Sequence, residues 1–337
     1  MRIIRWLAKA LIAGILALAI ACVVCLVYYN PGIHTTNQTG ATDYVWQSNS
    51  FSSTMTEGIA WNRTDKNGFY NTVCVDKQMD ILLMGSSQME GANVFPQQKV
   101  SSLLGEMTGQ TVYNLGISGH NLLTYTKNLE SALTVMQPTK YVLFEIGTTA
   151  YDEDDINACL SGEMANLPSY DSGLMFHLQK IPYFKLLYTQ IKSWDGVASD
   201  DTNQDDQEGS GDNDVISTDA YMQLVKRIHD VCADHKVKPI IFYHPHMRVA
   251  EDGSAIALVD DVSLTALQSA CQANDVTFVN VTDDFLAMYR EDHVLPRGFC
   301  NTAVGVGHLN KNGHKRIAEK LAETLAEDSQ VAEDENK

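Results

Sequence analysis

The sequence is poor in basic residues and in proline. Its 337 residues include 42 acids against 24 lysines and arginines, a formal net charge of −18. Proteins that bind nucleic acid present a basic surface, so this balance argues against nucleic acid as a partner. Eight prolines and 22 glycines exclude a collagen-like or proline-rich fibre. Because 45% of the residues are hydrophobic, the chain has enough apolar side chains to build a sizeable core.

The cysteines lack the spacing of metal ligands. Two of them lie in an apolar N-terminal run, and the other five are scattered along the chain: Cys74, Cys159, Cys232, Cys271 and Cys300. One or two disulfides outside the cell and buried free thiols fit this pattern equally well. The cysteines therefore predict neither a metal centre nor a disulfide framework.

The N-terminus predicts a membrane anchor. Residues 10–28 carry no charge, and as a helix they would span roughly 28 Å, about the hydrocarbon thickness of a bilayer. Three basic residues precede the run, Arg2, Arg5 and Lys9. The positive-inside rule then predicts a cytoplasmic segment at 1–9, a transmembrane helix at 10–29 and an extracytoplasmic remainder. The alternative, a cleaved signal peptide, is disfavoured because the run is long and no clean small-x-small site follows it.

The remainder alternates between strand and helix patterns. Five short apolar runs rich in β-forming residues predict strands at 80–84, 111–115, 141–146, 239–243 and 276–281. Helical patterns lie between or after them, at 97–107, 122–136, 220–235, 264–274 and 312–325. This alternation predicts a three-layer α/β/α domain with a five-stranded parallel sheet. In such sheets ligands bind beyond the carboxyl ends of the strands, so the residues after each strand matter most.

Three segments fall outside this pattern. Residues 30–78 are polar and aromatic, and we interpret them as a juxtamembrane lead-in that packs on the domain. Residues 199–214 hold seven acids and no large apolar side chain, which predicts a disordered acidic insertion. Residues 327–337 form a similar acidic tail. The α/β domain itself is expected to cover 79–326.

Four polar blocks follow predicted strands or precede the last helix. The first contains Gly85-Ser86-Ser87, where a serine in a strand-to-helix turn would be exposed as a nucleophile or would simply cap the helix. The second runs from Asn114 through Gly116 and Gly119, and the third follows Glu145. Taken singly, both are ordinary turns between a strand and a helix. The fourth is 305–318, in which a histidine precedes the last helix.

Together the four blocks resemble those of the SGNH/GDSL hydrolases, over residues 79–325. Ser87 matches the nucleophile of that family's Gly-Asp-Ser motif, and the Gly-Ser-Ser form also resembles membrane-anchored D-alanine transfer proteins of teichoic acid synthesis. The stretch from His308 to Ala318 resembles the family's His-Pro-Asn-x-x-Gly-His-x-x-Ile-Ala pattern. The resemblance implies a flavodoxin-like SGNH-type fold, Ser87 and His308 as catalytic residues, and no cofactor.

The resemblance also implies an oxyanion hole formed by the N–H groups of Ser87 and Gly119, with Thr149 in place of the family's asparagine. Gly305 stands where the family has its catalytic aspartate, three residues before the histidine. The acid is therefore unassigned, and the candidates are Asp283, Asp284 and Asp292. A Ser–His dyad oriented by a backbone carbonyl is the alternative.

Three further histidines are candidates for substrate binding. His244 and His246 follow the fourth strand and, being two residues apart, would share one side of it. His120 lies beside the second block. A metal site is disfavoured because no third ligand accompanies the pair and zinc needs three or more.

These observations predict a single-pass membrane protein with an extracytoplasmic serine esterase or O-acyltransferase domain. Its substrates would be acyl esters of a cell-envelope glycan or polymer, and a membrane acyltransferase is an expected partner. The rival hypothesis is a catalytically degenerate SGNH-like binding or scaffold module of an envelope polymer modification machine. The absence of the family's aspartates, at Gly305 and at Ala150, favours the rival.

Overall fold

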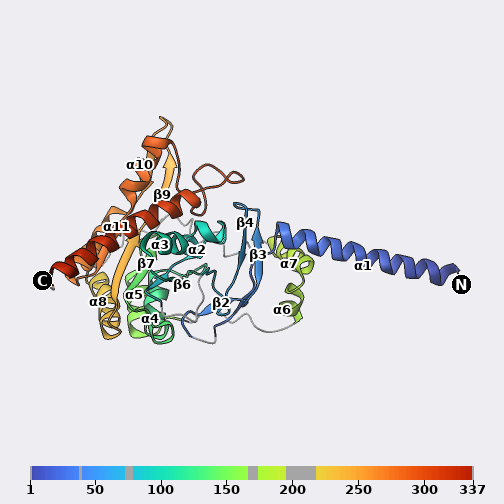
Figure 1. Ribbon diagram of the computed structural model, residues 1–337, viewed down its shortest axis with the longest axis horizontal. Coiled ribbons are helices and arrows are strands. Elements are labelled where there is room, and N and C mark those ends of the chain that lie inside the picture. Colours follow the sequence, from blue (N-terminus) through green and yellow to red (C-terminus); the bar gives the residue numbers. More distant parts are fainter. Residues whose placement is uncertain (1, 38–39, 73–78, 166–173, 195–217, 336–337) are drawn as a thin grey trace.

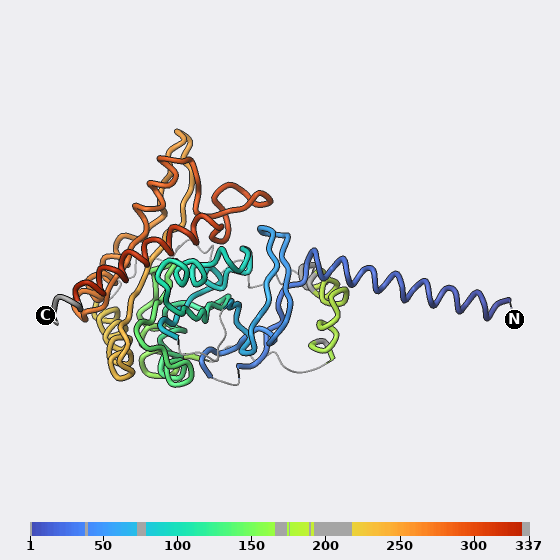
Figure 2. Tube along the Cα trace, viewed as in Figure 1, coloured from blue at the N-terminus to red at the C-terminus, as the bar shows by residue number. Residues whose placement is uncertain are grey.

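The computed structural model describes residues 2–37, 40–72, 79–165, 174–194 and 218–335. One long N-terminal helix, α1 (Arg2–Tyr28), projects from the α/β domain, and the two chain ends lie at opposite ends of the molecule (Figures 1 and 2). Among the described residues α1 is the single helix that is long and apolar enough to cross a bilayer. Its apolar composition and length therefore support the predicted anchor, and its first turns carry the three basic residues.

The domain is built on a five-stranded parallel sheet in the order β11-β8-β7-β5-β6. Its strands are β5 (Ile81–Met84), β6 (Val112–Asn114), β7 (Tyr141–Ile146), β8 (Lys238–Tyr243) and β11 (Thr277–Asn280). All five lie within one or two residues of the predicted runs, and the predicted α/β/α fold class is confirmed. The strand order places the ends of β5 and β7 side by side at the centre of the sheet.

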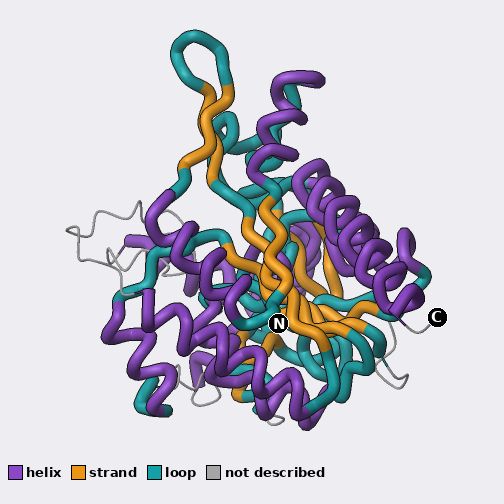
Figure 3. The backbone as a smooth tube through the Cα atoms, turned by 90° about the vertical axis from the view of Figure 1, so that its left-hand side faces the viewer, coloured by secondary structure: helices purple, strands orange, loops and turns teal. Residues whose placement is uncertain are grey.

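Helices cover both faces of the sheet (Figure 3). One face is covered by α4 (Leu122–Met136), α5 (Glu153–Ser161), α8 (Thr218–Asp234) and α9 (Asp261–Ala273). The other is covered by α3 (Val100–Thr108), α10 (Thr282–Asp292) and α11 (Lys311–Glu335). Side chains alternate between the two cores along each strand, so Leu82 packs in the first core and Leu83 in the second.

Short elements complete the chain. Before the sheet come β1 (His34–Thr36), β2 (Tyr44–Trp46), β3 (Phe51–Thr54) and β4 (Ala60–Arg63). Within and after it come α2 (Ser87–Glu90), the 3₁₀ turn η1 (Pro96–Gln98), α6 (Leu174–Gln179), α7 (Pro182–Trp194), β9 (His246–Val249) and β10 (Ala255–Leu258). The antiparallel hairpin of β9 and β10 projects from one end of the domain (Figure 3).

The described residues of the lead-in, 30–37 and 40–72, form two antiparallel strand pairs, β1 with β2 and β3 with β4. Tyr44, Trp46 and Phe69 are buried in the same core as α4 and β6. A lead-in with its own apolar side chains thus packs on the domain as a structural part of it.

Two predictions for acidic segments have different outcomes. Helix α11 runs on to Glu335, so most of the segment predicted as an acidic tail is helical. Its charged side chains form i,i+3 and i,i+4 pairs such as Lys315 with Glu319, which suit an exposed helix. The predicted acidic insertion, 199–214, lies outside the described residues.

Among the described cysteines, Cys159, Cys232 and Cys271 are buried free thiols.

We expect acid to weaken the docking of the lead-in, because the half-buried His34 and the buried His120 lie in this interface. The ring of His34 lies 4.5 Å from that of Tyr44, which lies 5.3 Å from that of His120. Burial lowers the pKa of His34 to about 3 and that of His120 to about 4. Below pH 6.5 these histidines become protonated in the unfolded chain but stay neutral in the folded chain. The free energy of unfolding therefore falls as the pH drops from about 6.5 towards 4.

The measurement is urea unfolding at a series of pH values between 7 and 4. Each histidine should contribute a slope of about 1.4 kcal/mol per pH unit at most. The double variant His34→Gln/His120→Gln should have a flatter slope than the wild type. The control is His229→Gln, at a solvent-exposed position, which should leave the slope unchanged. An identical slope in the double variant would contradict the prediction.

Candidate active site

Ser87 lies at the turn between β5 and α2. The chain leaves the strand at Met84, and Ser86 caps the short helix by accepting a 3.2 Å hydrogen bond from Gln88 N. Gly116 of the neighbouring loop is required here, because a Cβ at this position would lie 2.4 Å from Glu90 N. The glycine therefore lets the loop after β6 pack directly on the backbone of the serine helix.

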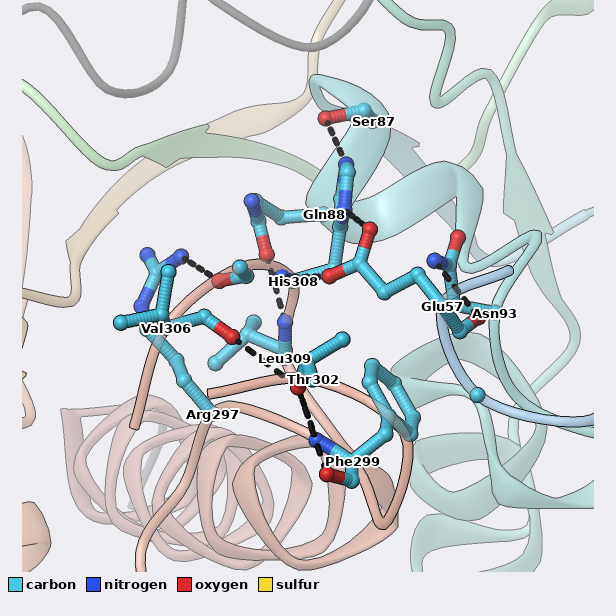
Figure 4. A network of polar contacts seen from close by, with 12 residues as sticks. Glu57, Ser87, Gln88, Asn93, Arg297, Phe299, Thr302, Val306, His308 and Leu309 are labelled. Atoms are coloured by element: carbon cyan, nitrogen blue, oxygen red, sulfur yellow. Dashed lines mark hydrogen bonds and ion pairs between the residues drawn. The ribbon is translucent and has the colours of Figure 1, made fainter. Parts of the chain in front are cut away.

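His308 lies beside Ser87 and is held by Glu57 (Figure 4). Its Nε2 is 3.0 Å from Ser87 Oγ, and its Nδ1 is 2.7 Å from Glu57 Oε2. The backbone N–H of His308 donates to the other carboxylate oxygen, Glu57 Oε1, at 2.5 Å. With the carboxylate ionised, Nδ1 carries the proton and Nε2 accepts from the serine hydroxyl. This is the acid–histidine–serine arrangement that activates a serine nucleophile.

Several contacts hold Glu57 in the turn between β3 and β4. Asn93 Nδ2 donates to Glu57 O at 3.1 Å, and Gly58 N donates to Asn301 Oδ1 at 2.9 Å. Burial raises the pKa of the Glu57 carboxyl, but its hydrogen bonds and charge interaction with His308 outweigh this, and the pKa lies below its ordinary value. The carboxylate is therefore ionised at neutral pH.

The acid that contacts His308 is Glu57 and not one of the three predicted aspartates. Asp283 and Asp284 lie in the first turn of α10 and Asp292 at its end, whereas the carboxylate on Nδ1 of His308 is that of Glu57. One hydrogen on Nδ1 satisfies one acceptor, so Glu57 fills the position for which those aspartates were candidates. Glu57 precedes His308 by 251 residues, and no motif marks it in the sequence.

The loop that carries His308 is joined to the serine helix. Gln88 Oε1, one residue after the serine, accepts a 2.8 Å hydrogen bond from Leu309 N, one residue after the histidine. Arg297 pairs with Leu309 as an isolated β-bridge and donates to Gly307 O at 3.1 Å (Figure 4). The separation of Ser87 and His308 is therefore fixed by neighbouring backbone contacts.

A buried charge network lies beneath both loops. Glu145, at the end of β7, accepts from Ser86 N at 2.7 Å and contacts His244 Nε2 at 2.7 Å. His244 Nδ1 lies 3.0 Å from the guanidinium of Arg297. Because arginine only donates, Nδ1 is the acceptor and Nε2–H donates to Glu145, which leaves a neutral histidine between two opposite charges. The network joins the residue before Ser87 to the residue before His308.

The structure overturns the prediction that His244 contacts substrate, because its side chain is 0% exposed and both ring nitrogens have partners in this network. His120 is also buried, at 4%, behind the lead-in. His246 begins β9 and is half-buried, so its role stays a prediction.

On the oxyanion side, Glu90 holds the loop after β6. Its Oε2 accepts from both Ser118 N, at 2.7 Å, and Ser118 Oγ, at 2.9 Å. The Tyr44 hydroxyl of the lead-in donates to Ser118 O. Burial raises the pKa of Glu90, and the nearby Lys99 partly offsets this. Gly119 follows in the left-handed conformation, φ +79°, which suits a glycine.

Thr149 is buried after β7, and its carbonyl accepts a hydrogen bond from the Tyr221 hydroxyl. The oxyanion roles of the Ser87 and Gly119 N–H groups and of Thr149 stay predictions. Among the described residues no group of three or more histidines, cysteines or acids is arranged to hold a metal ion.

Comparison with known proteins gives fold likeness alone. No family model matches the chain, and no curated protein matches it. A protein from Slackia heliotrinireducens described as a proposed SGNH hydrolase is 15% identical, with a TM-score of 0.40, over 74% of this chain and 100% of its own. Esterase EstA from a Pseudoalteromonas species is 11% identical, with a TM-score of 0.39, over 73% and 96%.

An acetyl xylan esterase, AlAXEase, is 13% identical, with a TM-score of 0.41, over 73% of this chain and 98% of its own. Likeness at these values carries no statement about the activity or substrate of this chain. The parallel sheet, the serine turn after its first strand and the histidine before its last helix come from this structure itself. In these features the chain resembles the SGNH/GDSL hydrolases.

Proposed function

We propose that this chain is a membrane-anchored, extracytoplasmic serine esterase or O-acyltransferase that acts on acyl esters of cell-envelope glycans or polymers. The observation that carries the proposal is the continuous set of contacts from Glu57 through His308 to Ser87, at 2.7 and 3.0 Å. A degenerate scaffold has no requirement for an acid on the histidine or for a serine within hydrogen-bond distance of it. The geometry therefore favours an enzyme over the rival scaffold.

In the proposed reaction Ser87 Oγ attacks the ester carbonyl carbon while His308 Nε2 takes the hydroxyl proton. The tetrahedral intermediate collapses, the alcohol leaves with the proton from His308, and the acyl group remains on Ser87. Water or an acceptor alcohol then attacks the acyl-enzyme and gives its proton to His308. The acyl group leaves on this acceptor, and Ser87 recovers the proton. Glu57 stabilises the imidazolium in both halves.

The location and partners rest on the N-terminal helix. Because α1 has basic residues at its far end, the domain would lie outside the cytoplasm. Tethering favours a substrate made or displayed at the membrane, and the chain's net charge of −18 disfavours strongly anionic polymers. A membrane acyltransferase that supplies or receives the acyl group is the partner that this arrangement suits.

Covalent labelling tests whether Ser87 is activated. The wild-type protein should react with a fluorophosphonate probe, and Ser87→Ala and His308→Ala should both lose the label while remaining folded by circular dichroism. The control is Ser161→Ala, at an exposed serine, which should label like the wild type. Absence of label on folded wild-type protein would reject the esterase proposal and leave the scaffold.

Glu57→Gln tests the role of the acid. An amide would not stabilise the imidazolium and would permit the wrong histidine tautomer, so kcat on an acetyl ester should fall by about 10⁴-fold. The melting temperature should stay close to that of the wild type, because the amide oxygen can still accept the hydrogen bond from the backbone N–H of His308. Glu291→Gln, at an exposed helical position, is the matched control. Unchanged kcat in Glu57→Gln would show that the pair does not act in catalysis.

Two substitutions at Thr149 separate its hydroxyl from its shape. Thr149→Val keeps the volume and removes the donor, and kcat should fall by about 10²–10³ if the hydroxyl binds the oxyanion. Thr149→Ser keeps the donor and should retain most of the activity. If both variants lose activity equally, the side chain matters for packing and not for the oxyanion.

A further inference from the structure

Helices α6 and α7 lie where α1 joins the domain. In Figures 1 and 2 they form the side of the domain from which α1 projects, and α7 packs against the end of α1. That end is fixed on the lead-in, because Trp61 Nε1 donates to Val27 O at 2.9 Å and Ser53 Oγ donates to Leu26 O at 2.8 Å. The two helices therefore occupy the position that would face a bilayer crossed by α1.

The outer side of α7 is apolar. Tyr183, Leu187 and Ile191 are spaced four residues apart and are 37%, 44% and 47% exposed. Leu174 of α6 is 73% exposed. Apolar residues at i, i+4 and i+8 of a helix in a water-soluble domain normally face the core. This stripe is exposed on a helix that packs against the end of α1, where Tyr28 is 60% exposed.

The same segment is basic in an acidic chain. Residues 174–194 contain Lys180, Lys185 and Lys192 and no acid, whereas the whole chain has a net charge of −18. Lys180 is exposed, whereas Lys185 is 5% exposed, contacts Asn30 Oδ1 at 3.4 Å and lines a cavity of about 180 Å³ between α7, the end of α1 and the lead-in. Positive charge beside an apolar stripe complements a surface that combines acyl chains with anionic headgroups.

We propose that α6 and α7 bind the surface of the lipid bilayer, with the stripe of Tyr183, Leu187 and Ile191 inserted at the level of the headgroups. The proposal rests on the membrane anchor of the proposed function, and it adds a second attachment that fixes the orientation of the domain. A helix with an apolar face, aromatic residues and flanking lysines has the composition of an interfacial helix. A single spanning helix can still tilt and rotate in the bilayer, and the domain joined to it would move with it.

Photocrosslinking of the full chain in lipid nanodiscs tests this contact. p-Benzoylphenylalanine replaces Leu187 in one protein, Leu16 of α1 in a second and Val331 of α11 in a third. Val331 is 58% exposed on α11, and this helix leads to the C-terminus, at the end of the molecule opposite to the N-terminus (Figure 1). The nanodiscs contain phosphatidylcholine with or without phosphatidylglycerol, and phospholipid adducts are counted by mass spectrometry after irradiation.

Position 187 should give several-fold more lipid adducts than position 331, with a further increase when phosphatidylglycerol is present. Adducts at 16 together with a background level at 187 would overturn the surface contact while leaving the anchor in place. A background level at 16 would instead reject the anchor. In that case adducts at 187 would still support the surface contact, and their absence would overturn it.

Discussion

The contact between Glu57 and His308 is the interaction on which the rest of the site depends. Without it the histidine would have no fixed tautomer, and the 3.0 Å separation from Ser87 Oγ would not by itself indicate an activated serine. The carboxylate accepts from both Nδ1 and the backbone N–H of His308, which sets the orientation of the ring as well as its position. The site is thus completed by a segment outside the α/β domain.

That segment also connects the site to α1, the candidate membrane span. Ser53 in β3 and Trp61 in β4 donate hydrogen bonds to carbonyl groups in the last turn of α1. Glu57 lies in the turn between these two strands. Asn301 fixes the turn by donating to Met55 O at 2.9 Å. The lead-in therefore links α1, the candidate membrane span, to the carboxylate that holds His308.

Buried polar side chains hold the loops around the candidate site. Glu145, His244 and Arg297 join the serine turn to the histidine loop, and Glu90 holds the loop of Gly119. Each of these groups is buried, and polar groups inside a protein are stable there when they are hydrogen-bonded. Such networks are rigid because every displacement leaves a buried polar group unpaired, which is the property that a preorganised site requires.

The sequence by itself determined the sheet, the anchor candidate, and the positions of Ser87 and His308. Those features depend on local periodicity and on short motifs next to strand ends, which a chain displays in order. Only the tertiary structure decided which acid contacts His308 and that His244 is buried away from the site surface. Glu57 reaches His308 across 251 residues through the docking of a hairpin, and His244 turns inward because Glu145 and Arg297 meet it there. Contacts of that kind depend on how distant segments pack together, and no local sequence pattern predicts them.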